Sequence, residues 1–250
     1  MLVTVIGCSG SFPGPDSPAS CYLVQADGYS LLLDLGSGAL GALQRHHSLY
    51  DIDAVCLSHL HADHCLDLCG YWVARRYCPH GPQPKIPVYG PEGTAERMAR
   101  AYDLEPEPGM REAFDFQPLR CGPREIGPFT VTTAPMSHPV DAYGFRVEYD
   151  GQVVAYSGDT GASETLVDLA RGADLFLCEA SFLDRPDLPA DLHLTAREAG
   201  EHATRAGVDR LVLTHLVPWN DRDRSLAEAE ASGFTGDIEL ARQGACYDLT

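Results

Sequence analysis

The sequence predicts an α/β fold, a four-layer αββα sandwich in which helices enclose two mixed sheets and the active site lies at the edge where strands end. Two observations support this prediction. Apolar runs of strand length come in two successive series, and each series leads into helical segments. Metal-ligating residue types directly follow strands in both series, so the site is expected along one edge of the sheets. A single domain is expected over residues 1–250, without a short-period repeat or a low-complexity tail.

The first series begins at the N-terminus with apolar runs. Asp27-Gly28 predicts a hairpin turn, because these residue types tolerate the positive φ of a tight turn. A turn-rich loop is expected at 8–15, and the prolines at 79–84 predict an irregular linker. The expected strands are 1–7, 21–26, 30–34, 54–57 and 86–90, and the expected helices are 39–47, 67–77 and 93–102.

The second series follows a polar loop at 105–109 and repeats the order of strands before helices. Asp150-Gly151 predicts a second hairpin between two apolar strands. The expected strands are 114–118, 129–134, 143–149, 152–157, 175–178, 211–214 and 245–249, and the expected helices are 166–170, 195–206 and 222–232.

Composition bounds the classes of function. A hydrophobic content of 44% with 22% charged residues is ordinary for a globular enzyme. No apolar run approaches the roughly 18 residues that span a bilayer. The N-terminus enters a strand directly without a basic segment, so no signal peptide and a cytoplasmic location are expected. The nine cysteines are odd in number and irregularly spaced, which favours reduced thiols over a disulfide framework or a structural zinc site.

The net charge of −18 also restricts the partners. An acidic surface repels polyanions at long range, so a large nucleic-acid footprint is not expected. A small anionic substrate can still bind if metal ions reverse the sign of the charge locally.

The densest cluster of chemically active side chains is His59-Leu60-His61-Ala62-Asp63-His64, which follows the apolar run at 54–57. Three histidines and an aspartate cannot share one face of a strand or helix, so we expect a loop that wraps them around one point. Imidazole nitrogen and carboxylate oxygen are ligands that zinc, manganese and iron accept. The alternative is a polar helix start with solvated histidines.

Three further metal-type residues each follow a strand. His138 comes after the strand at 129–134, Asp159 after 152–157 and His215 after 211–214. In open α/β sheets, ligands collect beyond the ends of the strands, so these residues can meet the first cluster in space. One histidine alone would be unremarkable, but four such strand ends together predict a metal site.

These motifs resemble the metallo-β-lactamase superfamily in its two-metal form, and the resemblance extends through nearly the whole chain. It implies two divalent metal ions, Zn²⁺ first, with Mn²⁺ or iron as alternatives. Metal ions roughly 3.5–4 Å apart can clamp both oxygens of an in-line displacement. The implied ligands are His59, His61 and His138 for one metal, Asp63, His64 and His215 for the other, and Asp159 as the bridge.

Two further motifs resemble the ribonuclease Z and phosphodiesterase branch of that superfamily. Cys178-Glu179-Ala180-Ser181 is similar to its HEAT motif, and His193-Leu194-Thr195 to its HST motif. The resemblance implies that His193 is a general acid oriented by Glu179 and that Asp63 positions the nucleophile. The alternative for His193 is a helix-capping or surface histidine. A homodimer is implied by analogy with the branch alone.

The chain departs from ribonuclease Z between His138 and Asp159, which are only 21 residues apart. Ribonuclease Z enzymes place a long arm there to grip transfer RNA, whereas this chain has a bare hairpin. The remaining sequence is similar to the actinobacterial atypical class II cyclic-nucleotide phosphodiesterases. The expected reaction is therefore hydrolysis of a small nucleotide phosphodiester, with 3′,5′-cyclic AMP first.

Three other functions stay open from the sequence. The first is hydrolysis of a lactone or thioester, against which Glu179 and His193 argue. The second is ribonuclease Z-like cleavage of RNA 3′ ends. The third is a metal-binding scaffold without hydrolytic activity.

Several residues have two readings each. The amides of Ser9-Gly10-Ser11 could face phosphate, and Trp219 could stack a base or belong to the core. Asp34 and Asp67 are candidate carboxylates behind a ligand imidazole, although Asp67 fits a helix N-terminus equally well. Surface positions are expected for the histidines outside the motifs, which are His46, His47, His80 and His202.

Overall fold

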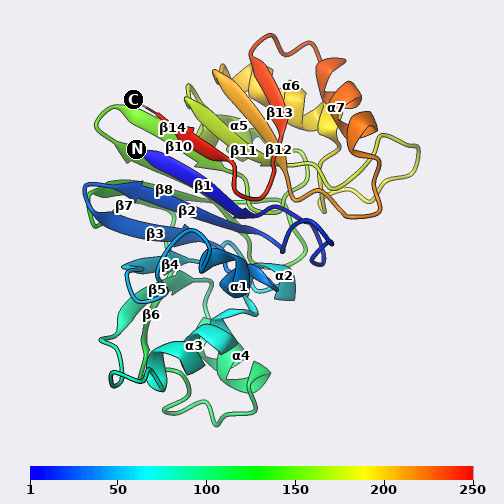
Figure 1. Cartoon of the computed structure of the whole chain (residues 1–250). Helices are drawn as coiled ribbons and strands as arrows, with labels where there is room; N and C mark the ends of the chain where they lie inside the picture. Colours follow the sequence, from blue (N-terminus) through cyan, green and yellow to red (C-terminus); the bar gives the residue numbers. More distant parts are fainter. Residues whose placement is uncertain (250) are drawn as a thin grey trace.

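In the computed structural model, which describes residues 1–249, two seven-stranded sheets face each other and helices cover the outer face of each sheet (Figure 1). Both sheets are mixed. The predicted four-layer αββα sandwich is therefore confirmed. Within the described residues, none of the helices combines the length and the apolar character that crossing a membrane requires.

The first sheet has the strand order β14-β1-β2-β3-β4-β5-β6. The pairs from β14 to β3 are antiparallel, and those from β3 to β6 are parallel. Its strands are β1 Leu2–Gly7, β2 Cys21–Ala26, β3 Tyr29–Leu33, β4 Ala54–Cys56, β5 Ile86–Gly90, β6 Phe114–Pro118 and β14 Cys246–Asp248. The helices of this half are α1 Ala39–Leu43, α2 Ala62–Cys65, α3 Leu68–Arg76 and α4 Thr94–Ala101.

The second sheet has the order β13-β12-β11-β10-β9-β8-β7 and repeats the same plan. Its antiparallel pairs run from β7 to β10, and its parallel pairs from β10 to β13. The strands are β7 Gly122–Ile126, β8 Phe129–Pro135, β9 Tyr143–Tyr149, β10 Gln152–Tyr156, β11 Leu175–Glu179, β12 Arg210–Thr214 and β13 Asp237–Leu240. The helices are α5 Glu164–Ala170, α6 Ala196–Ala206 and α7 Arg222–Glu230.

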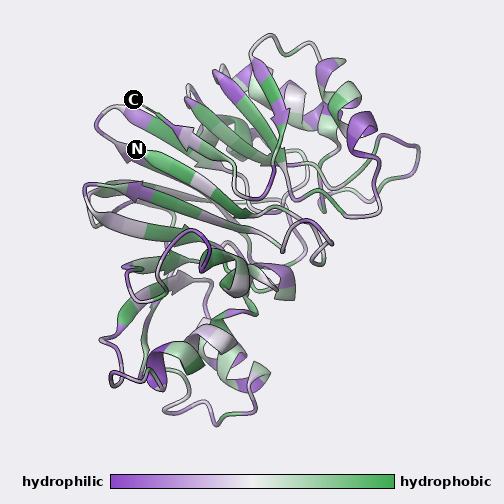
Figure 2. Cartoon of the chain, in the orientation of Figure 1, coloured by the Kyte–Doolittle hydropathy of each residue, from purple (hydrophilic) through white to green (hydrophobic). Residues whose placement is uncertain are grey.

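Alternation along the strands builds three apolar layers between the four layers of backbone. In β2, Tyr22 and Val24 face the opposite sheet, whereas Cys21 and Leu23 face the helices. Figure 2 shows the hydrophobic residues concentrated on the strands of both sheets. Side chains one residue apart point to opposite faces of a strand, so a strand covered on both faces is apolar throughout.

Two hydrogen bonds tie the sheets together close to the strand-end edge. The Tyr22 hydroxyl lies 2.5 Å from Thr214 Oγ1, and the Tyr156 hydroxyl donates to Asp34 Oδ2 at 2.7 Å. The rings of Tyr22 and Tyr156 also pack with centroids 4.8 Å apart. The sheets are therefore fixed to each other where β3, β10 and β12 end.

The structure corrects the predicted elements in three places. Strands β7 and β13 were not expected, and the helix expected over 39–47 ends at Leu43, followed by a turn. A single helical turn, α2, lies where a loop was expected to carry Asp63 and His64. The other strands and helices lie within two residues of their predicted bounds.

Candidate metal centre

The predicted metal loop begins after β4 and turns into α2. His61 is the N-cap of this helix with extended backbone angles, so His59 and His61 lie before the helix and Asp63 and His64 within it. His59 and His64 are completely buried. A helix does begin here, but the alternative of solvated histidines is wrong for this pair.

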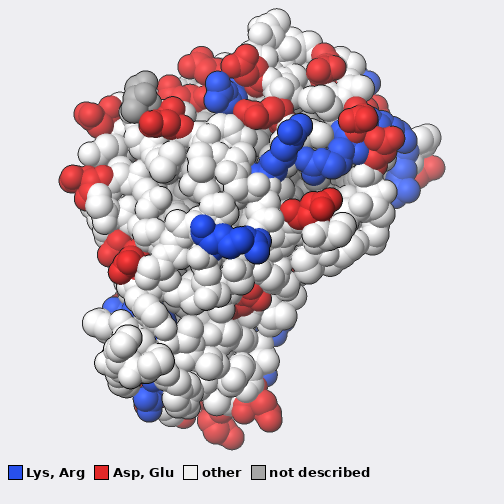
Figure 3. All heavy atoms as spheres, in the orientation of Figure 1, with Lys and Arg blue, Asp and Glu red and all other residues white. Residues whose placement is uncertain are grey.

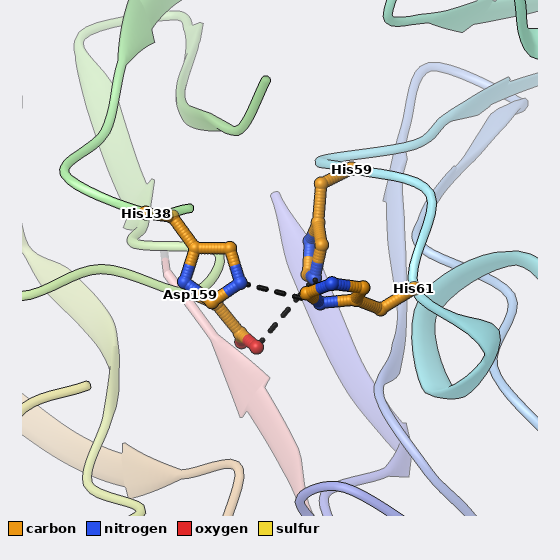
Figure 4. Close-up of side chains that lie close together, drawn as sticks. All are labelled: His59, His61, His138 and Asp159. Carbon is orange, nitrogen blue, oxygen red and sulfur yellow. Dashed lines mark hydrogen bonds and ion pairs between the residues drawn. The ribbon is translucent and has the colours of Figure 1, made fainter. Parts of the chain in front are cut away.

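The first group of donors comprises His59, His61, His138 and Asp159 (Figure 4). His61 Nδ1 lies 3.0 Å from His59 Nε2 and 3.2 Å from His138 Nε2. His59 Nε2 lies 3.6 Å from Asp159 Oδ2. Ligands at about 2.1 Å from a tetrahedral zinc lie roughly 3.4 Å from one another, so this spacing suits a bound cation.

The second group comprises Asp63, His64, Asp159 and His215. His64 Nε2 lies 3.4 Å from Asp63 Oδ2 and 3.2 Å from Asp159 Oδ1. His215 Nδ1 lies 3.1 Å from Asp159 Oδ1. Asp159 therefore belongs to both groups, with one carboxylate oxygen facing each, and all seven residues predicted as ligands come together.

Two buried polar atoms in this centre have no hydrogen-bond partner within the described residues, namely His64 Nε2 and Asp159 Oδ1. Leaving such atoms unpaired costs about 1–3 kcal/mol each. A cation between the donors would satisfy both atoms at once. The mixture of imidazole nitrogen and carboxylate oxygen suits Zn²⁺, Mn²⁺ or iron, so the residues fit the metal ions that the sequence implied.

Burial and mutual contacts set the protonation states of the donors. Burial lowers the pKa of His59, His61, His138 and His215, which keeps these imidazoles neutral and able to ligate. Burial would raise the pKa of Asp159, but the neighbouring His215, His64 and His59 outweigh it and hold that pKa well below its usual value. The Asp159 carboxylate is therefore ionised.

Asp34 fixes the orientation of His64 from behind. Its Oδ2 lies 2.7 Å from His64 Nδ1, which leaves Nε2 to face the donors. The same carboxylate accepts the Ser58 amide at 2.6 Å, the Ser58 hydroxyl at 2.8 Å and the Tyr156 hydroxyl. The structure supports the reading of Asp34 as a carboxylate behind a donor imidazole.

Asp67 contacts none of the donor imidazoles. Its carboxylate accepts the Leu40 amide at 2.8 Å, in the first turn of α1. The reading of Asp67 as a partner of a metal ligand is therefore wrong, and the carboxylate stabilises a helix N-terminus.

Glu179 and His193 form a hydrogen-bonded pair beside the donors. Glu179 ends β11 with no exposed surface, and its Oε1 lies 2.8 Å from His193 Nδ1. Glu179 also accepts the amides of Thr160 and Ser181, which fix its carboxylate. Burial would lower the pKa of His193, but Glu179 outweighs it and raises that pKa to about 9.

The alternatives for His193 do not fit its surroundings. Thr195 caps α6 in a capping box with Glu198, so His193 is not the helix cap. The His193 side chain is 13% exposed and lines a pocket of about 440 Å³. His193, Glu179 and Asp159 also lie close enough to form a third possible donor group.

The loop at Ser9-Gly10-Ser11 does not offer free amides to a phosphate. Ser11 donates its amide to Asp63 Oδ2 at 2.9 Å, while the amides of Ser9 and Gly10 bond to the backbone. The phosphate-binding reading of these amides is therefore wrong. The loop instead supports Asp63, and a Cβ on Gly10 would lie only 2.3 Å from the His215 carbonyl oxygen.

Some neighbours of the site were not expected from the sequence. Ser58 adjoins the histidine cluster and Thr160 adjoins Asp159, so both could have been suspected, but Tyr156 contacts Asp34 only because the two sheets face each other. His202, expected at the surface, is 4% exposed because it lies on the face of α6 that packs against the start of α5, where its Nε2 accepts the Ser163 amide. Trp219 is 75% exposed, so its reading as a core residue is wrong.

A family model described as a beta-lactamase superfamily domain matches residues 29–216, three quarters of the chain. The chain belongs to the β-lactamase superfamily. The probable metallo-hydrolase YhfI of Bacillus subtilis is 33% identical over 99% of this chain and 100% of its own. The crystal structure of YhfI matches with a TM-score of 0.88, 31% identity and 99% coverage of each chain. The chain is a metallo-hydrolase of this superfamily, as predicted.

Other relatives extend the comparison. ML1173 of Mycobacterium leprae is 46% identical over 99% of this chain and 88% of its own length. Ribonuclease Z of Thermobifida fusca is 32% identical over 95% of this chain and 91% of its own, in an alignment of 296 positions. A diphosphatase from the PhnP family shares the fold, with a TM-score of 0.79, 19% identity, and 100% and 98% coverage.

Replacing Asp34 by Asn tests its role behind His64. The amide keeps the shape of the carboxylate but loses the charge that orients the imidazole, so metal affinity is expected to fall about 10–100-fold. Competition with a chromogenic chelator measures the affinity. Asp67→Asn is the matched control and should bind metal as the wild type does. If Asp34→Asn bound metal as tightly as Asp67→Asn does, the role of Asp34 would be contradicted.

Proposed function

We propose that this metallo-hydrolase holds two divalent metal ions, most simply Zn²⁺, and cleaves a phosphodiester in a small nucleotide, with 3′,5′-cyclic AMP as the first candidate. The main supporting observation is the Glu179–His193 pair. It places a protonated imidazole beside the metal donors without using it to complete either of the two main donor groups. A phosphodiester needs such an acid, because its alkoxide leaving group must take up a proton.

The two groups of donors support a division of the ligands between two metal ions. His59, His61 and His138 would hold one metal ion, and Asp63, His64 and His215 the other, with Asp159 shared. When bound, the metal ions would supply an activated water molecule at neutral pH and neutralise charge on the phosphate oxygens.

The remaining roles fall to the protein's own side chains. Asp63 is held by the Ser11 amide and takes the proton of the attacking water. His193 donates its Nε2 proton to the leaving ribose oxygen, since its Nδ1 is engaged by Glu179. Glu179 is itself fixed by two backbone amides, so it holds the imidazole in one orientation.

Size and charge favour a small substrate over an RNA. Strands β9 and β10 are joined by a tight hairpin between His138 and Asp159, so no arm projects from this segment. The alignment with ribonuclease Z is longer than this chain, which indicates segments in that enzyme without a counterpart here. Acidic side chains are spread over the face shown in Figure 3, and basic ones gather mainly around α7.

The cytoplasmic location and the homodimer stay predictions.

A comparison of substrates tests the proposal. Metal-loaded protein is offered cyclic AMP, bis(p-nitrophenyl) phosphate, a precursor transfer RNA and a thioester, with chelator-treated protein as the control. We expect metal-dependent turnover of the two small diesters. Turnover of the thioester alone would establish the acyl-hydrolase alternative, and turnover of the RNA alone the nuclease alternative.

The variant His193→Ala separates general acid from metal ligand. We expect kcat to fall about 10²–10⁴-fold, because the leaving oxygen loses its proton donor, while metal content is unchanged. Asp63→Ala serves as the contrast, since it should lose both turnover and affinity for one metal. Elemental analysis and steady-state kinetics measure the two effects. Loss of metal from His193→Ala would make His193 a ligand instead.

The variant Glu179→Gln tests the same pair through pH. The carboxylate raises the pKa of His193, so the imidazole stays protonated until the pH passes about 9, and general-acid activity is lost as the pH rises further. Removing the negative charge lowers this pKa, so the alkaline limb of the kcat–pH profile should move to lower pH. An unmoved limb would assign that limb to another group.

A further inference from the structure

We propose that Trp219 and Phe12 form a stacking platform for the base of the nucleotide, an inference that rests on the proposed function. Trp219 is 75% exposed and lines the same pocket as His193. Phe12 is 37% exposed, and its ring centroid lies 4.9 Å from that of Trp219. Exposed aromatic surface at the mouth of a pocket is typical of a binding site rather than of a core.

The position of Trp219 is fixed by the turn that carries it. The Asn220 amide donates to the Val217 carbonyl at 2.9 Å, and Pro218 restricts φ at the first corner of this turn. The Asn220 side chain donates to the Ser181 carbonyl at 2.8 Å. Ser181 in turn donates its hydroxyl to the His215 carbonyl and its amide to Glu179. The indole is therefore anchored to the same backbone that positions the metal centre.

Phe12 is anchored in a similar way from the other side. Its neighbour Ser11 donates its amide to Asp63 Oδ2 at 2.9 Å. Ser11 has a φ of 63°, and the Phe12 amide bonds back to the Gly10 carbonyl at 2.7 Å, so the loop turns sharply. Trp219 follows His215 closely along the chain, and Phe12 is connected to Asp63 through the Ser11 amide, so both rings are anchored to donors of the metal centre.

The chemistry of the platform selects the kind of group that it binds. Flat aromatic faces stack on any nucleobase and favour the larger purines, without hydrogen bonds to the base edge. Arg185 and Arg224 line the same pocket and provide positive charge beside the aromatic surface. Arg224 is already paired with Glu228 at 2.8 Å, whereas no carboxylate among the described residues pairs with Arg185. A small anion with a planar base fits this combination.

Kinetics on matched substrates test the platform. Trp219→Ala should raise KM for cyclic AMP and lower kcat/KM roughly 5- to 150-fold, the range expected for loss of one base stack. The base-free control is methyl ribofuranoside 3,5-cyclic phosphate, for which kcat/KM should not change. Trp219→Phe should restore most of the loss. Tyr77→Ala, which removes an aromatic ring that is 64% exposed elsewhere, should behave as the wild type.

Fluorescence gives a readout that does not depend on turnover. The chain has two tryptophans, and the other, Trp72, is only 6% exposed, so quenching by a nucleotide reports on Trp219. We expect the Rp phosphorothioate of cyclic AMP to quench the metal-loaded wild type and not Trp219→Ala.

The outcomes separate the two proposals. Equal losses on cyclic AMP and the base-free substrate, or no loss on either, would overturn the platform while leaving the phosphodiesterase function intact. If the wild type cleaves no diester, the proposed function fails, and the fluorescence titration then decides the platform alone. Absence of quenching in the metal-loaded wild type would overturn the platform. Burial of Trp219 between two copies of the chain in solution would also overturn it, because a base could then not reach the indole.

Discussion

The buried carboxylate of Asp159 is the constraint on which the rest of the site depends. It is 2% exposed, and its Oδ1 lies within 3.2 Å of both His64 and His215. Removing a carboxylate from water costs several kcal/mol unless charge and hydrogen bonds compensate it. Here the surrounding donors come from both halves of the molecule, and a cation held between them would supply the compensating charge. Asp159 follows β10, where the antiparallel half of the second sheet meets the parallel half, so donors can approach it from either side.

Bringing these donors together requires unusual backbone around the centre. Asp34 and His215 have φ values of 61° and 53°, in a region that costs non-glycine residues energy. A Cβ on Gly36 would lie 1.9 Å from the Asp63 carbonyl oxygen, so that position has room for glycine only. The hydrogen bonds of Tyr22 and Tyr156 between the sheets fix the two halves of the molecule relative to each other. They therefore help to keep the backbone at Asp34 and His215 in its unfavourable conformation.

The strand ends could be predicted from the sequence because each one carries its own signal. An apolar run followed by His or Asp marks a donor, and the dense cluster at 59–64 made the pattern specific. The edge strands β7 and β13 carry charged residues and are exposed on alternate positions, so their pairing with β8 and β12 decides their structure. Likewise, Asp67 and Trp219 resembled site and core residues locally, and only the tertiary contacts assign them.

The acidic protein can bind the proposed anionic substrate because the charge at the metal centre would differ in sign from that of the whole chain. The donor set contains two carboxylates, Asp63 and Asp159, and the histidines other than His64 have lowered pKa values. Two divalent cations would therefore leave a net positive centre inside a protein of charge −18. Attraction of this kind is screened within about 8–10 Å, so it acts on a phosphate that has entered the pocket. A long polyanion must also lie across the acidic surface, where repulsion opposes it, and this difference favours a small nucleotide.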